Sequence, residues 1–377
     1  MVSLCIALTG DRPTGVNDFA ECWSASRQLL LRQNPYASQP KLAMELGLGA
    51  REPLPPVMVM RNPPWALPLV LPLGLLSYRA AQLLWSFIGI AAALVSIGLL
   101  WRAYSGPKQL YWQGWLSAGV FLPLATAIAI GQIGPLVLLG ITGFLICQEK
   151  RQDVWAGAFG LLIAIKPHLV FLFWPALLLW VLRERRWRVL WGLGLALTGA
   201  TALALGFDTQ VLHHYYELWI ETRVVWEEIP TPGGVLSLLI GHGQHWLAYV
   251  PAIGAAIWFA LRWGHDGRDW QWVEQIPLLL LVSVATTPYA WFFDQVVLLP
   301  AVLQAAARVS ARPVRKWLGP ALAYIGINVL NAGSDFRPSN FVLVRMDGIQ
   351  LAPALLSYDA AWCHPSGQIQ LRQYCVP

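Results

Sequence analysis

Apolar runs of roughly 15 to 22 residues, about the length that crosses a bilayer as a helix, recur along almost the whole chain. Short stretches that carry Arg, Lys, Gly and Pro separate them. Composition agrees, because 56% of the residues are apolar and 12% are charged, which leaves too little polar surface to coat a soluble globule. We therefore predict an all-α fold, a polytopic transmembrane helical bundle that forms one continuous membrane domain.

Ten spans are expected from residue 80 onward. Their approximate bounds are 80–101, 114–130, 133–147, 154–165, 168–182, 189–206, 235–261, 276–286, 296–307 and 317–330. The preceding run, 63–76, contains four prolines, so it is expected to be either a short kinked span or a re-entrant segment. Lys166 and Pro167 divide another apolar stretch into two short pieces. Such broken helices are tolerated where they line a cavity enclosed by protein.

Lys and Arg are distributed unevenly between the connections that join these spans. Alternate connections hold 14 of them, namely Arg102, Lys108, Lys150, Arg151, Arg183, Arg185, Arg186, Arg188, Arg262, Arg268, Arg308, Arg312, Arg315 and Lys316. The opposite connections hold Lys166, Arg223 and Arg337. Because Lys- and Arg-rich connections stay on the cytoplasmic side, we expect a multi-pass protein of the cell (plasma or inner) membrane with Lys166 at its exoplasmic end.

Three regions are expected along the chain. Residues 1–62 form an exoplasmic first loop after a short apolar start, with an amphipathic helix over 19–32 behind a candidate N-cap, Asp18. Residues 63–333 form the multi-span transmembrane domain. Residues 334–377 form an exoplasmic tail, in which Cys363 and Cys375 are spaced to form a disulfide in an oxidising compartment.

Charge and cysteine content argue against several classes of protein. The formal net charge is +6, but the basic residues sit in short clusters between apolar runs, where orientation in the membrane explains them. A nucleic-acid partner is therefore not expected. The five cysteines show neither CxxC spacing nor a Cys/His cluster, so no metal site is expected. Residues 1–10 lack the basic start of a cleavable signal peptide.

Several short motifs, taken together and in order, resemble glycosyltransferase family 87. Residues 17–23 read Asn-Asp-Phe-Ala-Glu-Cys-Trp and are followed by Leu29-Leu30 and Asn34-Pro35-Tyr36, similar to the first-loop signature of the family. Further matches are Asn62-Pro63-Pro64-Trp65, Gly131-Gln132, Lys166-Pro167, and Pro288-Tyr289-Ala290-Trp291 with Asp294. Each match alone is weak. Their shared order on one membrane face, over roughly residues 17–305, gives the resemblance its weight.

The resemblance implies a fold and an activity. The family contains polyprenyl-phosphate-mannose-dependent mannosyltransferases of the GT-C fold, in which a carboxylate of the first exoplasmic loop is taken as the catalytic base. Carried over, that role falls on Asp18. The expected partners are a polyprenyl-phosphate-linked sugar donor, a glycolipid or glycan acceptor, and membrane lipids; no cofactor is expected, because a lipid-phosphate donor requires neither a nucleotide-binding fold nor a metal-binding Asp-x-Asp.

The chain departs from the family pattern at three points. Family members usually have a full transmembrane helix before the first loop. Here only the apolar residues 1–10 precede Asp11, and they are too few to span a membrane. We therefore expect that the first helix is truncated or that the chain is mis-started at its N-terminus. Ile133 follows the Gly-Gln turn where the family often has Asn, and Gln33 stands where a first-loop Gly is common.

Each residue proposed to bind the donor or act as base also has a structural explanation. Asp18 precedes an amphipathic helix, where a carboxylate is often only an N-cap, and Asp11 or Glu21 could replace it as the base. Lys166 is a cation between apolar runs and needs a partner; either a donor phosphate holds it or it extends to the interface. His168 beside it either donates a second hydrogen bond to the phosphate or sugar or has a structural role.

The remaining candidates for substrate binding come from the exoplasmic connections. They are Gln132, Tyr36, Trp291, Asp294, His213 and Arg223. His213 and Arg223 belong to a loop, 208–228, that is dense in rings and charges, as sugar-binding surfaces are; the same rings also occur in interfacial belts. For Asp294 the alternative to substrate binding is a structural hydrogen bond.

Two other functions compete with the transferase. Broken helices and an intramembrane lysine also suit a transporter, although no internal repeat at half-length spacing is evident. A catalytically inactive member of the same fold is the other alternative. Transport predicts solute uptake by vesicles, an inactive member predicts neither uptake nor transfer, and the enzyme predicts sugar moved to an acceptor.

Overall fold

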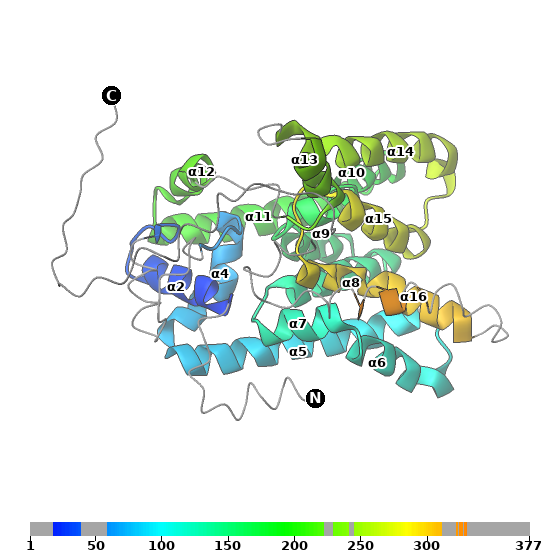
Figure 1. The fold of residues 1–377 in the computed structure, drawn as a ribbon, viewed down its shortest axis with the longest axis horizontal. Helices are drawn as coiled ribbons and strands as arrows, with labels where there is room; N and C mark the ends of the chain where they lie inside the picture. The colour runs from blue at the N-terminus through cyan, green and yellow to red at the C-terminus, as the bar shows by residue number, and fades with distance from the viewer. Residues whose placement is uncertain are drawn as a thin grey trace, which may run out of the picture. The chain divides into compact units, whose positions relative to one another are not determined.

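The computed structural model describes residues 18–38, 59–221, 229–240, 245–310, 322, 324–326 and 328–329. In these ranges all regular structure is helical and no strand occurs, which confirms the predicted all-α class (Figure 1). The α-helices are α2 (Phe19–Leu30), α4 (Leu67–Val70), α5 (Tyr78–Ala103), α6 (Tyr111–Gly119), α7 (Leu122–Ala129), α8 (Gly134–Glu149), α9 (Asp153–Ile163), α10 (Phe173–Glu184), α11 (Trp187–Phe207), α12 (Val211–Glu221), α13 (Pro232–Ile240), α14 (Val250–Asp266), α15 (Trp272–Thr286) and α16 (Leu299–Ser310).

Four helical segments are long and apolar enough to cross a membrane. They are Tyr78–Ala103, Trp187–Phe207, Trp246–His265 and Phe292–Ser310. Shorter apolar helices accompany them, at Pro64–Leu75, Gly134–Glu149, Asp153–Ile163 and Trp272–Thr286. Large apolar side chains such as Phe87 on α5, Trp191 on α11 and Leu261 on α14 are exposed, and apolar surface of this extent suits lipid rather than water.

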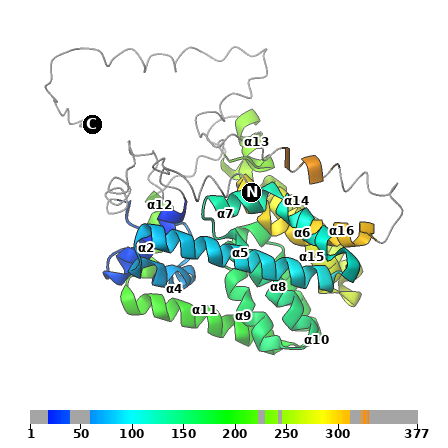
Figure 2. The ribbon, with the colours of Figure 1, turned by 90° about the horizontal axis from the view of Figure 1, so that it is seen from below.

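The centre of the bundle is α8, which packs between α5 and α9, and α9 in turn packs on α11 (Figure 2). Two glycines allow the crossing of α9 and α11. A Cβ atom at Gly157 would lie 1.9 Å from the carbonyl oxygen of Val189, and one at Gly192 would lie 2.1 Å from that of Val154. Small residues at a helix crossing let two backbones approach closely inside a membrane.

Connections at the two ends of the bundle differ in charge. At one end Arg186, between α10 and α11, donates hydrogen bonds to the carboxylate of Asp153 and the backbone carbonyl of Gln148, which flank the α8–α9 connection. At the other end of α8, the α7–α8 connection carries Gln132, which contacts Lys166 of the α9–α10 connection. Lys166 in turn contacts Asp294 of η8 (Phe292–Leu298), the 3-10 helix that begins the segment Phe292–Ser310. The bundle therefore separates the basic connections from the polar residues that the sequence motifs single out.

Three sequence predictions about the spans need correction. The expected span 114–130 is two helices, α6 and α7, because Pro123 cannot continue a helix and instead lies in the first turn of α7. The expected span 235–261 is also divided, into α13 and α14, with Pro251 in the first turn of α14. The expected span 168–182 begins as a 3-10 turn, η4 (Pro167–Val170), and only then becomes α10.

Two further segments belong to regions that the sequence analysis expected on the exoplasmic side. Part of the expected loop 208–228 is a helix, α12, which buries Val211 and Leu218 and exposes Tyr216 and Trp219; this two-sided pattern is typical of interfacial helices. The proline-rich run is a broken helix made of η1 (Pro64–Ala66), α4 and η2 (Leu71–Leu75), against which α2 packs. Most of the expected span 317–330, the tail 334–377 and the cysteine pair of the tail lie outside the described residues.

Candidate active site at the Lys166 end

The site begins where α2 meets the turn between α7 and α8. The backbone N–H of Phe19 donates to the carbonyl of Ile130 at 3.2 Å. Gly131 has a φ of 78°, and a Cβ atom there would lie 2.5 Å from the Cβ of Phe19. Only glycine fits such a turn without strain, and this close approach places Asp18 beside Gln132.

The carboxylate of Asp18 faces Gln132 and does not cap α2. Asp18 is the residue before α2, but its backbone is αR and its side chain makes no capping hydrogen bond. Instead, Gln132 Nε2 donates to Asp18 Oδ2 at 2.5 Å. The helix α2 itself lies where the amphipathic pattern predicts it, so the capping position was predicted correctly while the capping interaction is absent.

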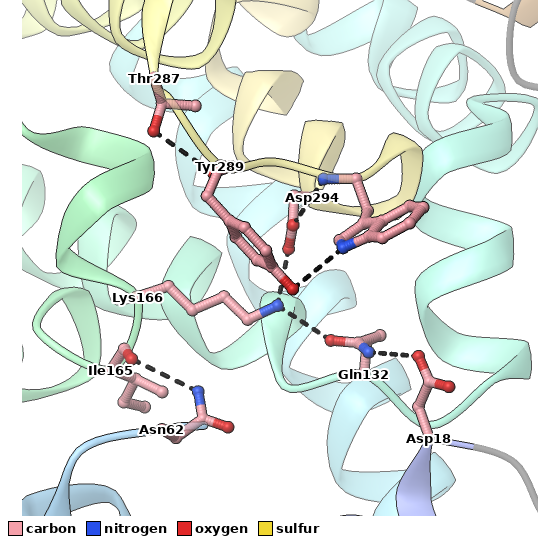
Figure 3. Close-up of polar contacts among 9 residues, drawn as sticks. Asp18, Asn62, Gln132, Ile165, Lys166, Thr287, Tyr289 and Asp294 are labelled. Carbon is pink, nitrogen blue, oxygen red and sulfur yellow. Dashed lines mark hydrogen bonds and ion pairs between the residues drawn. The ribbon is translucent and has the colours of Figure 1, made fainter. Parts of the chain in front are cut away.

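A chain of polar contacts runs from Asp18 across the site (Figure 3). Lys166 Nζ donates to Gln132 Oε1 at 2.9 Å and lies 2.6 Å from Asp294 Oδ1. The Lys166 and Asp294 side chains are 12% and 2% exposed. The other oxygen of Asp294 accepts a hydrogen bond from the Trp291 backbone N–H at 3.0 Å. Lys166 thus has a protein partner, and Asp294 serves both the ion pair and the local backbone.

Aromatic side chains and a histidine surround the Lys166–Asp294 pair. Trp291 Nε1 donates to the hydroxyl of Tyr289 at 3.1 Å. The Tyr289 ring lies edge-on to His168, with 5.7 Å between the ring centroids. His168 Nε2 is buried and has no hydrogen-bond partner in the described part of the chain. A buried, unpaired ring nitrogen is unusual in a folded protein and marks a place where a ligand can bind.

The first loop holds the Lys166 segment from the other side. Tyr36 donates its hydroxyl hydrogen to the carbonyl of Asn62 at 3.1 Å, and Asn62 Nδ2 donates to the carbonyl of Ile165 at 3.4 Å. Trp65 Nε1 donates to the carbonyl of Ala164 at 2.9 Å. The segment that begins at Asn62 therefore fixes the backbone directly before Lys166.

A sequence model of glycosyltransferase family 87 matches residues 61–288 of this chain. The chain belongs to glycosyltransferase family 87. It is therefore a transferase, a membrane glycosyltransferase that uses a sugar donor and an acceptor. No curated protein and no solved structure gives a significant match. The match to family 87 includes Gln132, Lys166 and His168, whereas Asp18 precedes it and Asp294 follows it.

Not every residue expected at the family 87 site lies in this cluster. Asp18, Gln132, Lys166, His168, Trp291 and Asp294 are brought together, and Tyr36 is connected to them through Asn62. His213 is instead on the exposed face of α12, where its Nε2 lies 3.1 Å from Glu217 Oε1. Arg223 lies outside the described residues. Among the described residues no group of three or more His, Cys, Asp or Glu side chains could hold a metal ion.

Sequence reasoning missed one charged residue beside this site, Arg61. It directly precedes Asn62, whose side chain reaches the Lys166 segment, and it is half-buried. Arg61 precedes residue 80, where the first of the ten expected spans begins, so it is not among the Lys and Arg of the connections between those spans. Its position at the start of the Asn-Pro-Pro-Trp motif was the available signal.

The site favours the protonated form of Asp18 more strongly than water does. Burial raises the pKa of the Asp18 carboxyl, while the hydrogen bond from Gln132 and the charge of Lys166 oppose that rise only in part. Lys166 lies in the connection between α9 and α10. Burial acts to lower its pKa, but the adjacent Asp294 carboxylate outweighs burial, so the pKa is raised and the ammonium stays charged.

The family resemblance gives Asp18 the role of base, and for a base with a raised pKa we expect the transfer rate to fall on acidification through that pKa. A base must be deprotonated to act, and a raised pKa places its protonation at a higher pH than for an ordinary aspartate. The rate should therefore begin to fall above the normal range of a carboxyl and recover on return to neutral pH. A pH–rate profile at saturating donor checks this; a rate that holds down to the pH of an ordinary aspartate would contradict it.

Proposed function

We propose that the chain transfers a sugar, with mannose favoured, from a polyprenyl-phosphate donor to a glycolipid or glycan acceptor on the exoplasmic face of the cell membrane. The observation that carries the proposal is the contact chain from Asp18 through Gln132 and Lys166 to Asp294. It places a buried carboxylate and a buried cation within one polar cluster, on connections that alternate with the basic ones.

In this proposal Asp18 is the general base. Its carboxylate takes the proton of the acceptor hydroxyl while the acceptor oxygen attacks the anomeric carbon of the sugar. The bond between that carbon and the phosphate oxygen breaks, and the electron pair leaves with the lipid phosphate. Gln132 fixes the orientation of the carboxylate by donating to one oxygen, which leaves the other oxygen for the acceptor.

The departing phosphate needs hydrogen-bond donors that are in place before the reaction. Lys166 and His168 are the proposed donors. The Lys166 ammonium is held by Gln132 and Asp294, so it is pre-positioned, and the third N–H of an ammonium remains for a ligand. His168 Nε2 is unpaired in the described part of the chain. Tyr36, Trp291 and the exoplasmic residues of the 208–228 segment are proposed to bind sugar and acceptor.

The orientation of the proposed site in the membrane gives a direct prediction. Because Lys and Arg collect in the connections opposite the site, the α10–α11 connection should be cytoplasmic and α12 exoplasmic. In a background without native cysteines, an impermeant thiol reagent added outside intact cells should label Cys at position 213 and not at position 185. His213 and Arg185 are both exposed, so access is matched. Labelling of position 185 from outside would invert the proposed orientation.

A donor panel tests the proposed function. Membranes that contain the chain are incubated with labelled polyprenyl-phosphate mannose, polyprenyl-phosphate arabinose or nucleotide-linked mannose, and label is followed into lipid and glycan products. Transfer from a polyprenyl-phosphate sugar, and none from the nucleotide sugar when the host's own donor synthesis is blocked, is the expected result. Transfer from the nucleotide sugar under that block would refute the donor class. Uptake of free solute without transfer would favour a transporter.

A further inference from the structure

The site, as described so far, has too little positive charge to bind a phosphate. Asp18 and Asp294 supply two carboxylates, whereas Lys166 supplies a single ammonium, which lies 2.6 Å from Asp294. In its deprotonated form, Asp18 would leave this trio with a net negative charge. A lipid phosphate adds further negative charge, and like charges repel strongly in a buried site. Binding the phosphate there requires another cation.

Arg61 is a candidate for this cation. Among the arginines whose burial the structure describes, three are not exposed. Of these, Arg186 donates to Asp153 and Arg262 donates to Gln275. Arg61, the third, has no hydrogen bond or ion pair among the described residues. A half-buried guanidinium normally finds a partner, because its removal from water is otherwise costly. The donors of Arg61 are thus unpaired within the part of the chain that the structure describes, and an anion would stabilise them.

Arg61 is connected to the site through its neighbour in the chain and through its charge. The next residue, Asn62, donates to the carbonyl of Ile165, directly before Lys166 (Figure 3). The charge of Arg61 also acts on the hydroxyl of Tyr289: burial raises the pKa of that hydroxyl, while its hydrogen bond with Trp291 and the charge of Arg61 act in the opposite direction. Tyr289 in turn packs against His168, whose Nε2 is buried without a partner in the described residues.

We propose that Arg61, together with His168, binds the phosphate of the lipid-linked donor and stabilises it as it leaves. This inference rests on the proposed function, because it assigns the phosphate of that donor to a residue. A guanidinium suits the role, since it stays charged at all relevant pH values and can donate two parallel hydrogen bonds to phosphate oxygens. With Arg61 included, the cations of the site equal the two carboxylates before the donor binds.

The experiment compares a charged lipid with its uncharged counterpart and needs no sugar transfer. Full-length chain in lipid nanodiscs is titrated with undecaprenyl phosphate and with undecaprenol. The wild-type chain should bind the phosphate at least tenfold more tightly than the alcohol. Arg61→Gln should weaken binding of the phosphate about tenfold to a hundredfold, as expected for loss of charge-assisted hydrogen bonds, and leave binding of undecaprenol unchanged. Arg61→Lys should recover part of the loss.

The matched control is Arg32→Gln, which removes an exposed arginine from the end of α2 and should bind both lipids as the wild type does. The outcomes separate the two proposals. A wild-type chain without preference for the phosphate would count against the proposed donor class. A wild-type preference that Arg61→Gln retains in full would overturn the role of Arg61 while leaving the donor class intact. Weaker binding of both lipids by Arg61→Gln would show a general structural effect and would also overturn it.

Discussion

Replacing Asp18 by Asn should lower the rate of sugar transfer about a hundredfold to ten-thousandfold, the usual cost of removing a positioned general base. Asn has nearly the same shape and can accept the hydrogen bond that Gln132 donates at 2.5 Å, but it cannot take the proton of an acceptor. Transfer should be measured at saturating donor in membranes that contain equal amounts of each protein. The thermal midpoint should stay close to that of the wild type.

The stability readout matters because Asp18 occupies the capping position of α2. Loss of a capping interaction would cost about 0.5 to 2 kcal/mol of stability, yet the Asp18 side chain makes no capping hydrogen bond. Asp18→Asn should therefore affect rate and not folding. Glu21→Gln, in the first turn of α2, is the parallel variant. Full activity in Asp18→Asn with loss in Glu21→Gln would transfer the role of base to Glu21.

Replacing Lys166 by Met should both destabilise the protein and abolish use of the donor. The Asp294 carboxylate is 2% exposed and its charged partner is Lys166 at 2.6 Å. Removing one member of a buried ion pair leaves an uncompensated charge, which costs about 3 to 5 kcal/mol. Denaturant or thermal unfolding in detergent measures this cost, and titration with a polyprenyl-phosphate sugar measures the loss of donor binding.

Two further variants distinguish the loss of stability caused by breaking the ion pair from the loss of donor binding. Asp294→Asn added to Lys166→Met removes the stranded charge and should restore much of the stability but none of the donor binding. Arg308→Gln breaks an ion pair with Glu274 in which both side chains are about half exposed and should change stability by less than about 1 kcal/mol. If Lys166→Met were as stable as the wild type, the pair would not be the buried, charged contact described here.

Hydrophobicity was a sound guide to the long helices and a poor guide to breaks between them. The predicted spans 80–101 and 189–206 correspond to α5 and α11, because their apolar stretches are continuous and unbroken by proline. The helix of the first loop was likewise predicted by its two-sided pattern. The break between α6 and α7 was missed, since the sequence stays apolar across it and the position of the break depends on Pro123 and local packing.

For the site, sequence motifs identified most of the residues but not their contacts. Asp18, Gln132, Lys166 and Asp294 are far apart in the chain, and only the packing of the α7–α8, α9–α10 and α15–α16 connections shows that they form one chain of contacts. The sequence offered a donor phosphate or the membrane interface as the explanation of Lys166, and it could not show the contact with the Asp294 carboxylate, because the two residues are 128 positions apart in the chain. Arg61 was missed because its relation to the site depends on the contact between Asn62 and Ile165.

The most direct test of this account is the difference in sugar transfer between two sets of membranes that contain equal amounts of the wild-type chain or of Asp18→Asn. Both are incubated with labelled polyprenyl-phosphate mannose, and label is counted in the extracted lipid and glycan products. We predict that the wild type transfers at least a hundredfold more label than the variant. Equal label in the two sets would contradict the claim that this site, with Asp18 as its base, transfers sugar from a lipid phosphate.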